Sequence, residues 1–498
     1  MMKELTVFMV FAWIVSTTGH DFFSSTTRNE LFSSTDKTAQ LFEEETVLLE
    51  SFRLYINAEE KNVERMKSIL LALQLLTYTD PESPEKTMRV PAAAYKLLRR
   101  VRSEWLTIIQ YTQLSLYEIY QKLLNDSTIP QPEDLNAAAS ELIRLQEFYK
   151  LYPHNLTKEA PLNADEAYHI GLVAYDEHKF QHAFLWFLYS RERLTEYSIV
   201  DEKKLLDLLS SSAYIFGNLP VAIYFSQLLL NQDPTNDEVK VKLNLYKHLR
   251  FQKTSNPDIF TLNTKSENSY EALCRGEVDE RTSKRQRALS CRYSTGGGNP
   301  RLMYAPVKEE VEWDEPRIIR YHDIISDREI EFLKNISRPQ LSRSKTRLGV
   351  SKIRTSQSVF LEEDHPVLAR ISQNIADITG LSVESAEVLH VQNYGIGGRF
   401  ESHYDASDVE NGRIATFLIY MSDVEKGGAT VFPEVGVALK PKMGSAVFWY
   451  NLQKNGRVDW DTLHAGCPVL MGNKWLATKW IHEFGQEFRR PCSLSETV

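Results

Sequence analysis

The sequence predicts a multidomain protein with an all-α N-terminal half and a C-terminal all-β sandwich or jelly roll. Apolar residues recur at helical spacings from Leu41 to Leu76. Small residues that suit helix crossings recur between residues 160 and 248. After Pro316, short β-rich runs are punctuated by Gly and Pro, which is the pattern of an all-β domain with many short strands. These runs are expected at residues 386–391, 414–420, 429–432, 445–450 and 474–481, with a helix before them at residues 366–379.

The composition excludes several classes of protein. Of the 498 residues, 42% are hydrophobic and 25% are charged, which excludes wholesale disorder. The net charge of −9 makes the chain a poor electrostatic partner for nucleic acid. The basic run Lys284–Arg287 is therefore expected to be solvated surface. The one prominent apolar run, Leu5–Val15, is too short to span a membrane.

The first residues have the layout of a secretory signal peptide. Lys3 precedes the apolar run, and small residues up to Gly19 follow it. We expect residues 1–19 to be cleaved, with a buried N-terminal helix as the alternative. The C-terminus is not a retention signal of the KDEL type. Three N-glycosylation sequons agree with the secretory pathway: Asn125, Asn155 and Asn335.

The N-terminal half divides into two helical units. Residues 20–150 contain a mobile Ser/Thr-rich leader and then long amphipathic helices, typical of a dimerisation domain with coiled-coil character. Residues 160–248 resemble two diverged tetratricopeptide repeats, with Ala183 and Ala222 at the helix crossings. Such repeats form grooves that hold extended peptides, although an ordinary stack of helical hairpins is the alternative. Residues 249–312 are polar and are predicted to form a linker.

The four cysteines fall into two pairs along the sequence, Cys274 with Cys291 and Cys467 with Cys492. Four cysteines allow three pairings, and closing the two shorter loops is the simplest of them. This predicts one local disulfide in the linker and a second near the C-terminus. The absence of C-x-x-C spacing argues against a zinc ribbon or a thioredoxin-type site.

The candidate chemistry lies in His403-Tyr404-Asp405 and a distant histidine, His464. Residues two apart on a strand point to the same side, so His403 and Asp405 can reach one ion. Two histidines and a carboxylate that leave open positions form the facial arrangement of non-haem Fe(II) oxygenases. Lys474 stands among aromatic residues, and a buried lysine needs an anion, which a dicarboxylate on the same ion would supply. A surface lysine extending past apolar neighbours is the alternative.

Six further motifs carry a specific resemblance: Asn393-Tyr394-Gly395, His403-Tyr404-Asp405, Arg413-Ile414-Ala415-Thr416, Gly427-Gly428-Ala429-Thr430-Val431-Phe432-Pro433, Ala446-Val447-Phe448-Trp449-Tyr450 and Gly472-Asn473-Lys474-Trp475. With them, residues 313–498 resemble the catalytic domain of the collagen prolyl 4-hydroxylase α subunit, and the resemblance extends over nearly the whole chain. It implies a double-stranded β-helix (jelly-roll) domain. It also implies a dioxygenase that uses Fe(II), O2 and 2-oxoglutarate to convert peptidyl proline to 4-hydroxyproline, releasing succinate and CO2.

The resemblance implies three iron ligands: His403, Asp405 and His464. It implies that Lys474 binds the far carboxylate of 2-oxoglutarate, that His482 has a supporting role near the co-substrate, and that Tyr394 lines the same pocket. L-ascorbate is the implied reductant of the iron. Protein disulfide isomerase is the implied β subunit of an α2β2 tetramer in the endoplasmic reticulum lumen. The two disulfides of the family match the two local cysteine pairs.

The predicted peptide groove departs from the family. Its candidate residues are Tyr175, Lys179, Phe180, Leu208, Ser211 and Tyr214. The family has Asp-Tyr-Tyr where Lys179-Phe180-Gln181 stand, and tyrosines at positions 208 and 211. Aromatic grooves dock polyproline helices, so these changes are expected to alter peptide choice, and Lys179 to favour acidic peptides. The alternatives are a hydroxylase of non-collagen proline-rich secreted proteins, a lysine hydroxylase, and an inactive peptide-binding or assembly subunit.

Overall fold

The computed structural model describes residues 35–58, 88–104, 132–250, 257–259, 269–281, 290–345, 353–406 and 410–493. The predicted signal peptide, the sequon at Asn125 and the run Lys284–Arg287 lie outside these ranges. The side chains of Asn155 and Asn335 are exposed. Within the described ranges, no helix combines the length and apolar character needed to cross a membrane.

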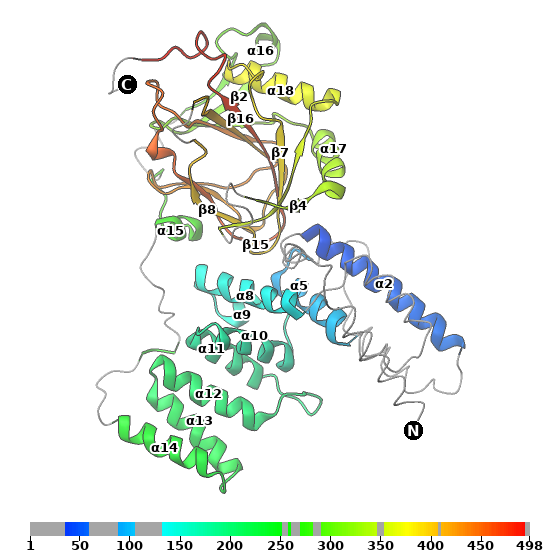
Figure 1. Ribbon diagram of the computed structural model, residues 1–498, viewed down its shortest axis with the longest axis vertical. Helices are drawn as coiled ribbons and strands as arrows, with labels where there is room; N and C mark the ends of the chain where they lie inside the picture. The colour runs from blue at the N-terminus through cyan, green and yellow to red at the C-terminus, as the bar shows by residue number, and fades with distance from the viewer. Residues whose placement is uncertain are drawn as a thin grey trace.

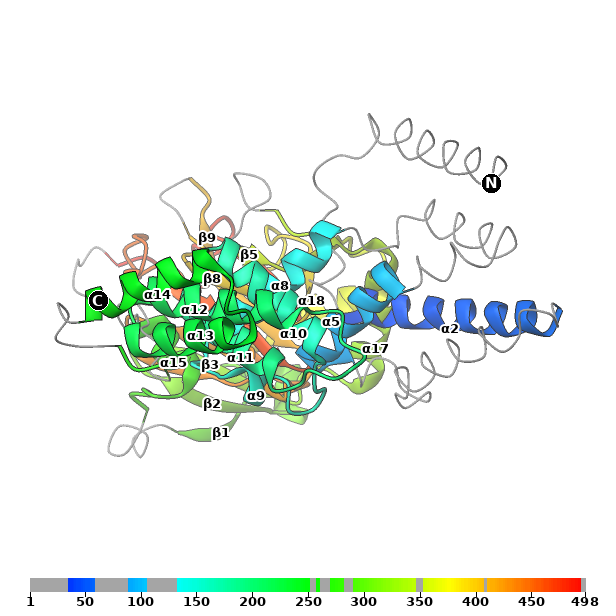
Figure 2. The same cartoon turned by 90° about the horizontal axis from the view of Figure 1, so that it is seen from below.

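The N-terminal half is helical, as predicted (Figure 1). Its elements are α2 Thr35–Ala58, α5 Pro91–Arg99, the π-helical turn η2 Arg100–Glu104, α8 Pro132–Phe148, α9 Pro153–Leu156, α10 Ala164–Asp176, α11 Phe180–Arg191, α12 Glu202–Phe216, α13 Leu219–Gln232 and α14 Asp237–Arg250. Helix α2 begins inside the predicted leader and projects away from the rest of the chain (Figure 2). A buried ion pair between Glu45 and Arg100 joins α2 to the end of α5.

Helices α10 to α14 stack in sequence order, as the repeat pattern predicts (Figure 1). Asn163 and Glu166 form a capping box that starts α10. A Cβ on Gly171 would lie 2.5 Å from the ring of Phe187, so only glycine allows α10 and α11 to approach this closely. The small residues that identified the repeat in the sequence therefore mark real helix crossings.

The C-terminal part is an antiparallel β-domain. Its strands are β1 Cys291–Ser294, β2 Val307–Trp313, β3 Ile318–His322, β4 Ser342–Arg343, β5 Arg354–Thr355, β6 Gln357–Leu361, β7 Leu389–Tyr394, β8 Arg399–His403, β9 Arg413–Tyr420, β10 Lys426–Gly427, β11 Thr430–Phe432, β12 Val437–Leu439, β13 Ala446–Tyr450, β14 His464–Gly466, β15 Val469–Met471 and β16 Lys474–His482. Its helices and turns are α15 Ser269–Arg275, α16 Pro300–Tyr304, α17 Asp327–Ser337, η3 Arg338–Gln340, α18 Pro366–Thr379 and η4 Trp460–Thr462.

Two main sheets make up the β-domain, as a jelly roll requires. The nine-stranded sheet has the order β1-β2-β3-β13-β9-β16-β7-β6-β4, and the five-stranded sheet has the order β12-β11-β14-β8-β5. A third sheet contains β10 and β15. Strands β1 and β2 belong to the large sheet, so the folded β-domain extends upstream of the predicted boundary at residue 313.

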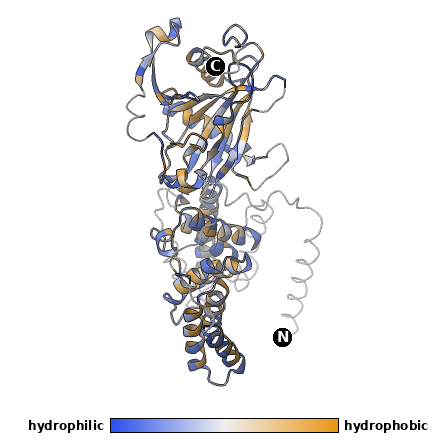
Figure 3. Cartoon of the chain, turned by 90° about the vertical axis from the view of Figure 1, so that its left-hand side faces the viewer, coloured by the Kyte–Doolittle hydropathy of each residue, from blue (hydrophilic) through white to orange (hydrophobic). Residues whose placement is uncertain are grey.

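The central strands of the large sheet, β9, β13 and β16, are buried on both faces, which explains the apolar runs in their sequence. Figure 3 shows the hydropathy of the residues along these strands. On β9, Phe417 and Ile419 join the apolar cluster formed with α17 and α18. Leu418 and Tyr420 point the other way and pack with residues of the five-stranded sheet such as Phe432. The helices thus cover one face of the large sheet, and the small sheet covers the other.

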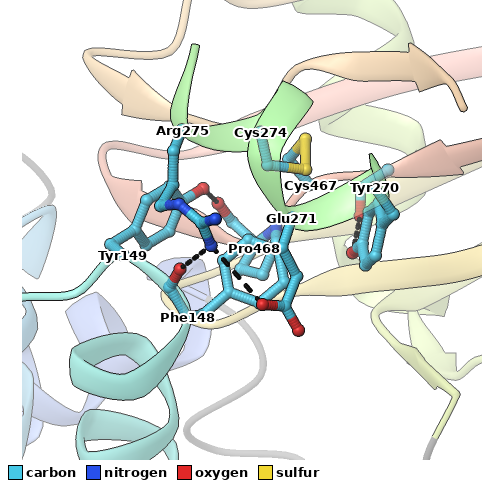
Figure 4. Close-up of a disulfide and its surroundings, with 9 residues drawn as sticks. Phe148, Tyr149, Tyr270, Glu271, Cys274, Arg275, Cys467 and Pro468 are labelled. Carbon is cyan, nitrogen blue, oxygen red and sulfur yellow. Dashed lines mark hydrogen bonds and ion pairs between the residues drawn. A yellow bond between two sulfur atoms is a disulfide. The ribbon is translucent and has the colours of Figure 1, made fainter. Parts of the chain in front are cut away.

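The disulfide pairing differs from the prediction. Cys274 on α15 is bonded to Cys467, which follows β14, while Cys291 and Cys492 are free and exposed (Figure 4). The predicted bridges Cys274–Cys291 and Cys467–Cys492 are therefore wrong. Sequence spacing measures only the entropy of loop closure. Here an apolar cluster seats α15 on the small sheet and brings the two distant cysteines together: Phe148, Tyr270, Leu273, Ala429, Val431, Ala465 and Cys467.

Replacing Cys274 with serine is expected to lower the free energy of unfolding by about 2–4 kcal/mol, because the bridge closes a loop with a sequence separation of 193. Cys291→Ser is the matched control and should change stability little, since that thiol is exposed and unbonded. Denaturant unfolding under non-reducing conditions measures both variants. A non-reducing peptide map that joins Cys274 to Cys291 would contradict the pairing.

Candidate functional site

Two antiparallel strands of the small sheet bring two histidines together. His403 ends β8 and His464 begins β14, and the two are direct register partners whose ring centroids lie 4.3 Å apart. Asp405 stands two residues beyond β8. Its carboxylate oxygens lie 3.8 Å from Nε2 of His403 and 3.5 Å from Nε2 of His464. The structure therefore assembles the three side chains that the sequence singled out.

Both imidazoles are held in one orientation by backbone carbonyls. Nδ1 of His403 donates to the carbonyl of Glu401 at 2.8 Å, and Nδ1 of His464 donates to that of Thr462 at 3.0 Å. A carbonyl can only accept, so the proton is on Nδ1 and the lone pair of Nε2 faces Asp405. Burial, aided by the neighbouring His464, lowers the pKa of His403 to about 3, so this ring is neutral at physiological pH.

The Asp405 carboxylate is held by a threonine on β9. Thr416 Oγ1 donates to Asp405 Oδ2 at 2.7 Å and accepts from Asn451 Nδ2 at 2.9 Å. Burial acts to raise the pKa of Asp405, but His464 and His403 outweigh it, so the pKa stays below its ordinary value. Thr416 belongs to the motif Arg413-Ile414-Ala415-Thr416, but nothing in that motif indicates a hydrogen bond to Asp405. Asn451 had no signal in the sequence.

The three side chains can hold one metal ion. In the part of the chain that the structure describes, their ligand atoms all lie within 4.8 Å of one another. Two imidazoles and one carboxylate are a donor set that suits Fe(II) and leaves coordination positions for other ligands. The donor chemistry therefore fits the iron expected from the sequence.

Lys474 is a buried cation without an acidic partner among the described residues. Lys474 is 2% exposed, and burial lowers the pKa of its ammonium to about 7. Nζ lies 5.5 Å from the ring centroid of Tyr394, its register partner on β7. A Cβ built on Gly466 would lie 3.8 Å from Nζ, which places the ammonium beside β14, the strand of His464. A small dianion that also reached the metal would supply the missing counter-charge.

The lowered pKa of Lys474 predicts that the affinity for 2-oxoglutarate depends on pH. The ammonium is the binding form, so the KM for 2-oxoglutarate should rise as pH increases through about 7, approaching a tenfold rise per pH unit above the pKa. Lys474→Arg is the matched control, because a guanidinium stays charged and should remove this dependence. Steady-state kinetics at saturating Fe(II) measure both. Identical pH profiles for the two enzymes would contradict the prediction.

Two other predicted pocket residues have different outcomes. Tyr394 is 4% exposed and stands beside Lys474, as expected for a residue of the same pocket. His482 lies at the opposite end of β16 from Lys474. Its ring contacts the carbonyl of Asn411 and, at 3.2 Å, a carboxylate oxygen of Glu387. The structure does not bring His482 to the lysine end of the pocket.

The predicted groove residues are spread over three helices. Tyr175 on α10 and Phe180 on α11 make an edge contact with centroids 5.1 Å apart. Leu208, Ser211 and Tyr214 follow one another along α12. Leu208 and Ser211 are partly buried, while Tyr214 is 36% exposed. Tyr214 is therefore the most accessible of the three predicted groove residues on α12.

Two contacts revise the expected chemistry of this groove. Tyr214 stacks on Tyr246 of α14 with centroids 4.6 Å apart, and Tyr246 was not singled out in the sequence. Its place in the last turns of an amphipathic helix gave no functional signal. Lys179 lies 3.1 Å from Glu147 and 3.5 Å from Glu177. Since the chain itself supplies these carboxylates, the expectation that Lys179 attracts acidic peptides is not supported.

Comparison with protein families assigns three regions. Residues 34–161 match the prolyl 4-hydroxylase alpha-subunit N-terminal region. Residues 164–252 match the prolyl 4-hydroxylase peptide-substrate-binding domain. Residues 389–482 match the 2OG-Fe(II) oxygenase superfamily.

Curated relatives align along almost the full chain. Prolyl 4-hydroxylase subunit alpha-1 of Rattus norvegicus is 39% identical over 92% of this chain and 94% of its own length. Subunit alpha-3 of Bos taurus is 33% identical over 90% of this chain and 91% of its own length. Among solved structures, the viral collagen prolyl hydroxylase of Paramecium bursaria Chlorella virus-1 is 26% identical, covering 33% of this chain and 95% of its own, with a TM-score of 0.29.

Proposed function

The chain belongs to the prolyl 4-hydroxylase α-subunit family and is a 2-oxoglutarate- and Fe(II)-dependent prolyl 4-hydroxylase, and we propose that it acts on collagen-like, proline-rich peptides. One observation locates the active site: His403, Asp405 and His464 form a cluster, and the buried Lys474 lies nearby. These residues are the proposed metal ligands and the proposed carboxylate-binding cation.

The protein groups have separate tasks in the reaction. When bound, Fe(II) and 2-oxoglutarate supply the oxidising chemistry, in which O2 is consumed, succinate and CO2 are released, and a proline C4–H becomes C4–OH. His403 and His464 present Nε2 because their Nδ1 protons are committed to carbonyls. Thr416 fixes the carboxylate of Asp405. Lys474 orients the far end of the keto acid, and the apolar walls of the two sheets exclude water.

The setting of the enzyme is part of the proposal. The signal-peptide layout, the sequons at Asn125, Asn155 and Asn335, and the disulfide support folding in the endoplasmic reticulum lumen. Family membership supports assembly with protein disulfide isomerase as the β subunit of an α2β2 tetramer. L-ascorbate is the proposed reductant that keeps the iron in the ferrous state. His482 is proposed to have a supporting role for the co-substrate from the end of β16 opposite Lys474, where it shares Glu387 with Arg413.

A turnover assay tests the function. The full chain, co-expressed with protein disulfide isomerase, should release succinate in the presence of a (Pro-Pro-Gly) repeat peptide, Fe(II) and 2-oxoglutarate. The peptide should gain one oxygen atom per event, located on C4 of proline by fragmentation. A matched peptide with alanine in place of proline is the control. Succinate release that ignores the peptide would point to an inactive or differently specific subunit.

The stacked pair of Tyr214 and Tyr246 predicts that the KM for the peptide depends on peptide length. Tyr214→Ala should raise the KM for long peptides about tenfold, because it removes an exposed ring that a polyproline helix can stack on, and should leave short peptides unaffected. Tyr224→Ala is the matched control, since that ring is also exposed but lies on α13 and contacts Phe225, outside the pair of Tyr214 and Tyr246. Equal KM values for the two variants would remove Tyr214 from peptide binding.

A further inference from the structure

Helix α8 lies between the helical repeats and the β-domain (Figure 1). Two of its charged side chains contact strand β8. Arg144 Nη2 donates to Glu401 Oε1 at 2.7 Å. Arg399 Nη1 donates to Glu141 Oε2 at 3.2 Å, and Arg399 Nε lies 3.5 Å from Glu401 Oε1. The four side chains therefore form one network of alternating charge, with two members on α8 and two on β8.

This network is attached to the strand segment that orients His403. The backbone carbonyl of Glu401, whose side chain binds Arg144, accepts the Nδ1 proton of His403 at 2.8 Å. Arg399 is 2% exposed, and a buried guanidinium requires carboxylate partners. Displacement of Glu401 would therefore disturb the histidine orientation and leave a buried cation less well compensated.

The backbone beside the network is shaped for close approach. Gly397, in the turn that leads into β8, has a φ of +73°, and a Cβ there would lie 3.0 Å from Glu141 Oε2. A side chain at position 397 would therefore be strained and would press on the carboxylate of Glu141. The amide of Gly397 also donates to the carbonyl of Val469 on β15, which ties this turn to the segment that follows β14.

The C-terminal end of α8 is tied to the strand of the second histidine (Figure 4). Tyr149 donates its hydroxyl proton to the carbonyl of Pro468 at 2.5 Å. The carbonyl of Phe148 accepts from Arg275 of α15, and α15 is bonded to the same loop through Cys274–Cys467. The segment of α8 and Tyr149 thus contacts β8, the strand of His403, and the loop that follows β14, the strand of His464.

We propose that α8 is a positioning element of the metal centre: its ion pairs with β8 fix His403 relative to His464, so the helical half of the chain sets the metal affinity of the β-domain. Arg144 and Glu141 touch no metal ligand and act through Glu401 and Arg399. The inference rests on the prolyl hydroxylase function only for the identity of the metal.

Charge reversal in the full-length protein tests the proposal, with Co(II) as the spectroscopic probe. Arg144→Glu should weaken Co(II) binding about 10-fold, as expected for loss of a group that orients a metal ligand. Far-UV circular dichroism should stay unchanged, while the apo-protein unfolding midpoint should fall modestly, because Glu401 loses its partner on α8. The conservative variant Arg144→Lys should retain most of the affinity, because an ammonium at this position can still pair with Glu401 and leaves the contact between Glu401 and Arg399 intact.

The matched control is Glu147→Lys, a charge reversal on the same helix at a residue that pairs with Lys179 instead of β8. It should leave Co(II) binding unchanged. Unaltered affinity in Arg144→Glu would overturn the proposal, as would an equal loss of affinity in Arg144→Lys or in Glu147→Lys. Because the readout is metal binding, these outcomes are independent of whether the hydroxylase assay succeeds with a given peptide.

Discussion

Replacing His464 with alanine is expected to abolish metal binding and proline hydroxylation while the protein remains folded. The imidazole is one of only two nitrogen donors in the cluster, and its Nε2 faces the same carboxylate as that of His403. Removing it leaves two protein ligands, which no longer define the facial arrangement. Asp405→Ala should have the same result, because it removes the single anionic donor.

Two measurements on the purified chain decide this prediction. Anaerobic Fe(II) titration reports binding, and succinate release with a proline-rich peptide reports turnover. His322→Ala is the control: this histidine lies on β3 and pairs with Glu310, outside the cluster, so activity should persist. Detectable hydroxylation by His464→Ala would remove the cluster from the mechanism.

Lys474→Ala should raise the KM for 2-oxoglutarate by about 30-fold or more while Fe(II) binding is retained. Losing the partner of a desolvated carboxylate costs on the order of 2–5 kcal/mol. Lys474→Arg should recover part of the affinity, because a planar guanidinium is a poor substitute for a compact ammonium in a fitted pocket. An unchanged KM in Lys474→Ala would show that the lysine is not at the co-substrate.

Removing the charge of Lys474 should stabilise the ligand-free protein, although it weakens 2-oxoglutarate binding. In the ligand-free protein Lys474 is a buried cation whose ionisation burial disfavours. Lys474→Met keeps similar volume without the charge, so it should raise the apo-protein unfolding temperature near pH 6, where the lysine is protonated. A lower unfolding temperature would mean that the ammonium has a stabilising partner in the folded chain.

The sequence predicted those elements whose pattern depends on burial. Strands expected at residues 414–420, 445–450 and 474–481 correspond to β9, β13 and β16, because burial of both faces produces apolar runs. Helix α18 has the expected bounds, since Pro366 opens it and Gly380 in the left-handed conformation ends it. Strands β8 and β14 were missed because they have 5 and 3 residues and carry polar site groups.

The site was predictable where its chemistry is local or belongs to a motif. His403 and Asp405 stand two apart, and Lys474 stood out as a charge among aromatic residues. Contacts between segments far apart in the sequence left no such signal. Thr416 with Asn451, Arg144 with Glu401, and Cys274 with Cys467 all depend on how separate elements pack. The disulfide prediction failed for this reason, because loop length alone favoured the wrong partners.

The pairing of β8 with β14 limits how this protein can evolve. His403 and His464 face each other directly, and the register shifts between His464 and Gly466. Side chains alternate between the faces of a strand, so deleting one residue after His464 would turn every following position of β14 to the opposite face. Surface loops elsewhere in the domain can gain or lose residues gradually. Within β14 a single-residue insertion or deletion would move Gly466 away from Lys474 in one step, so descendants with an altered length there would lose the co-substrate pocket outright.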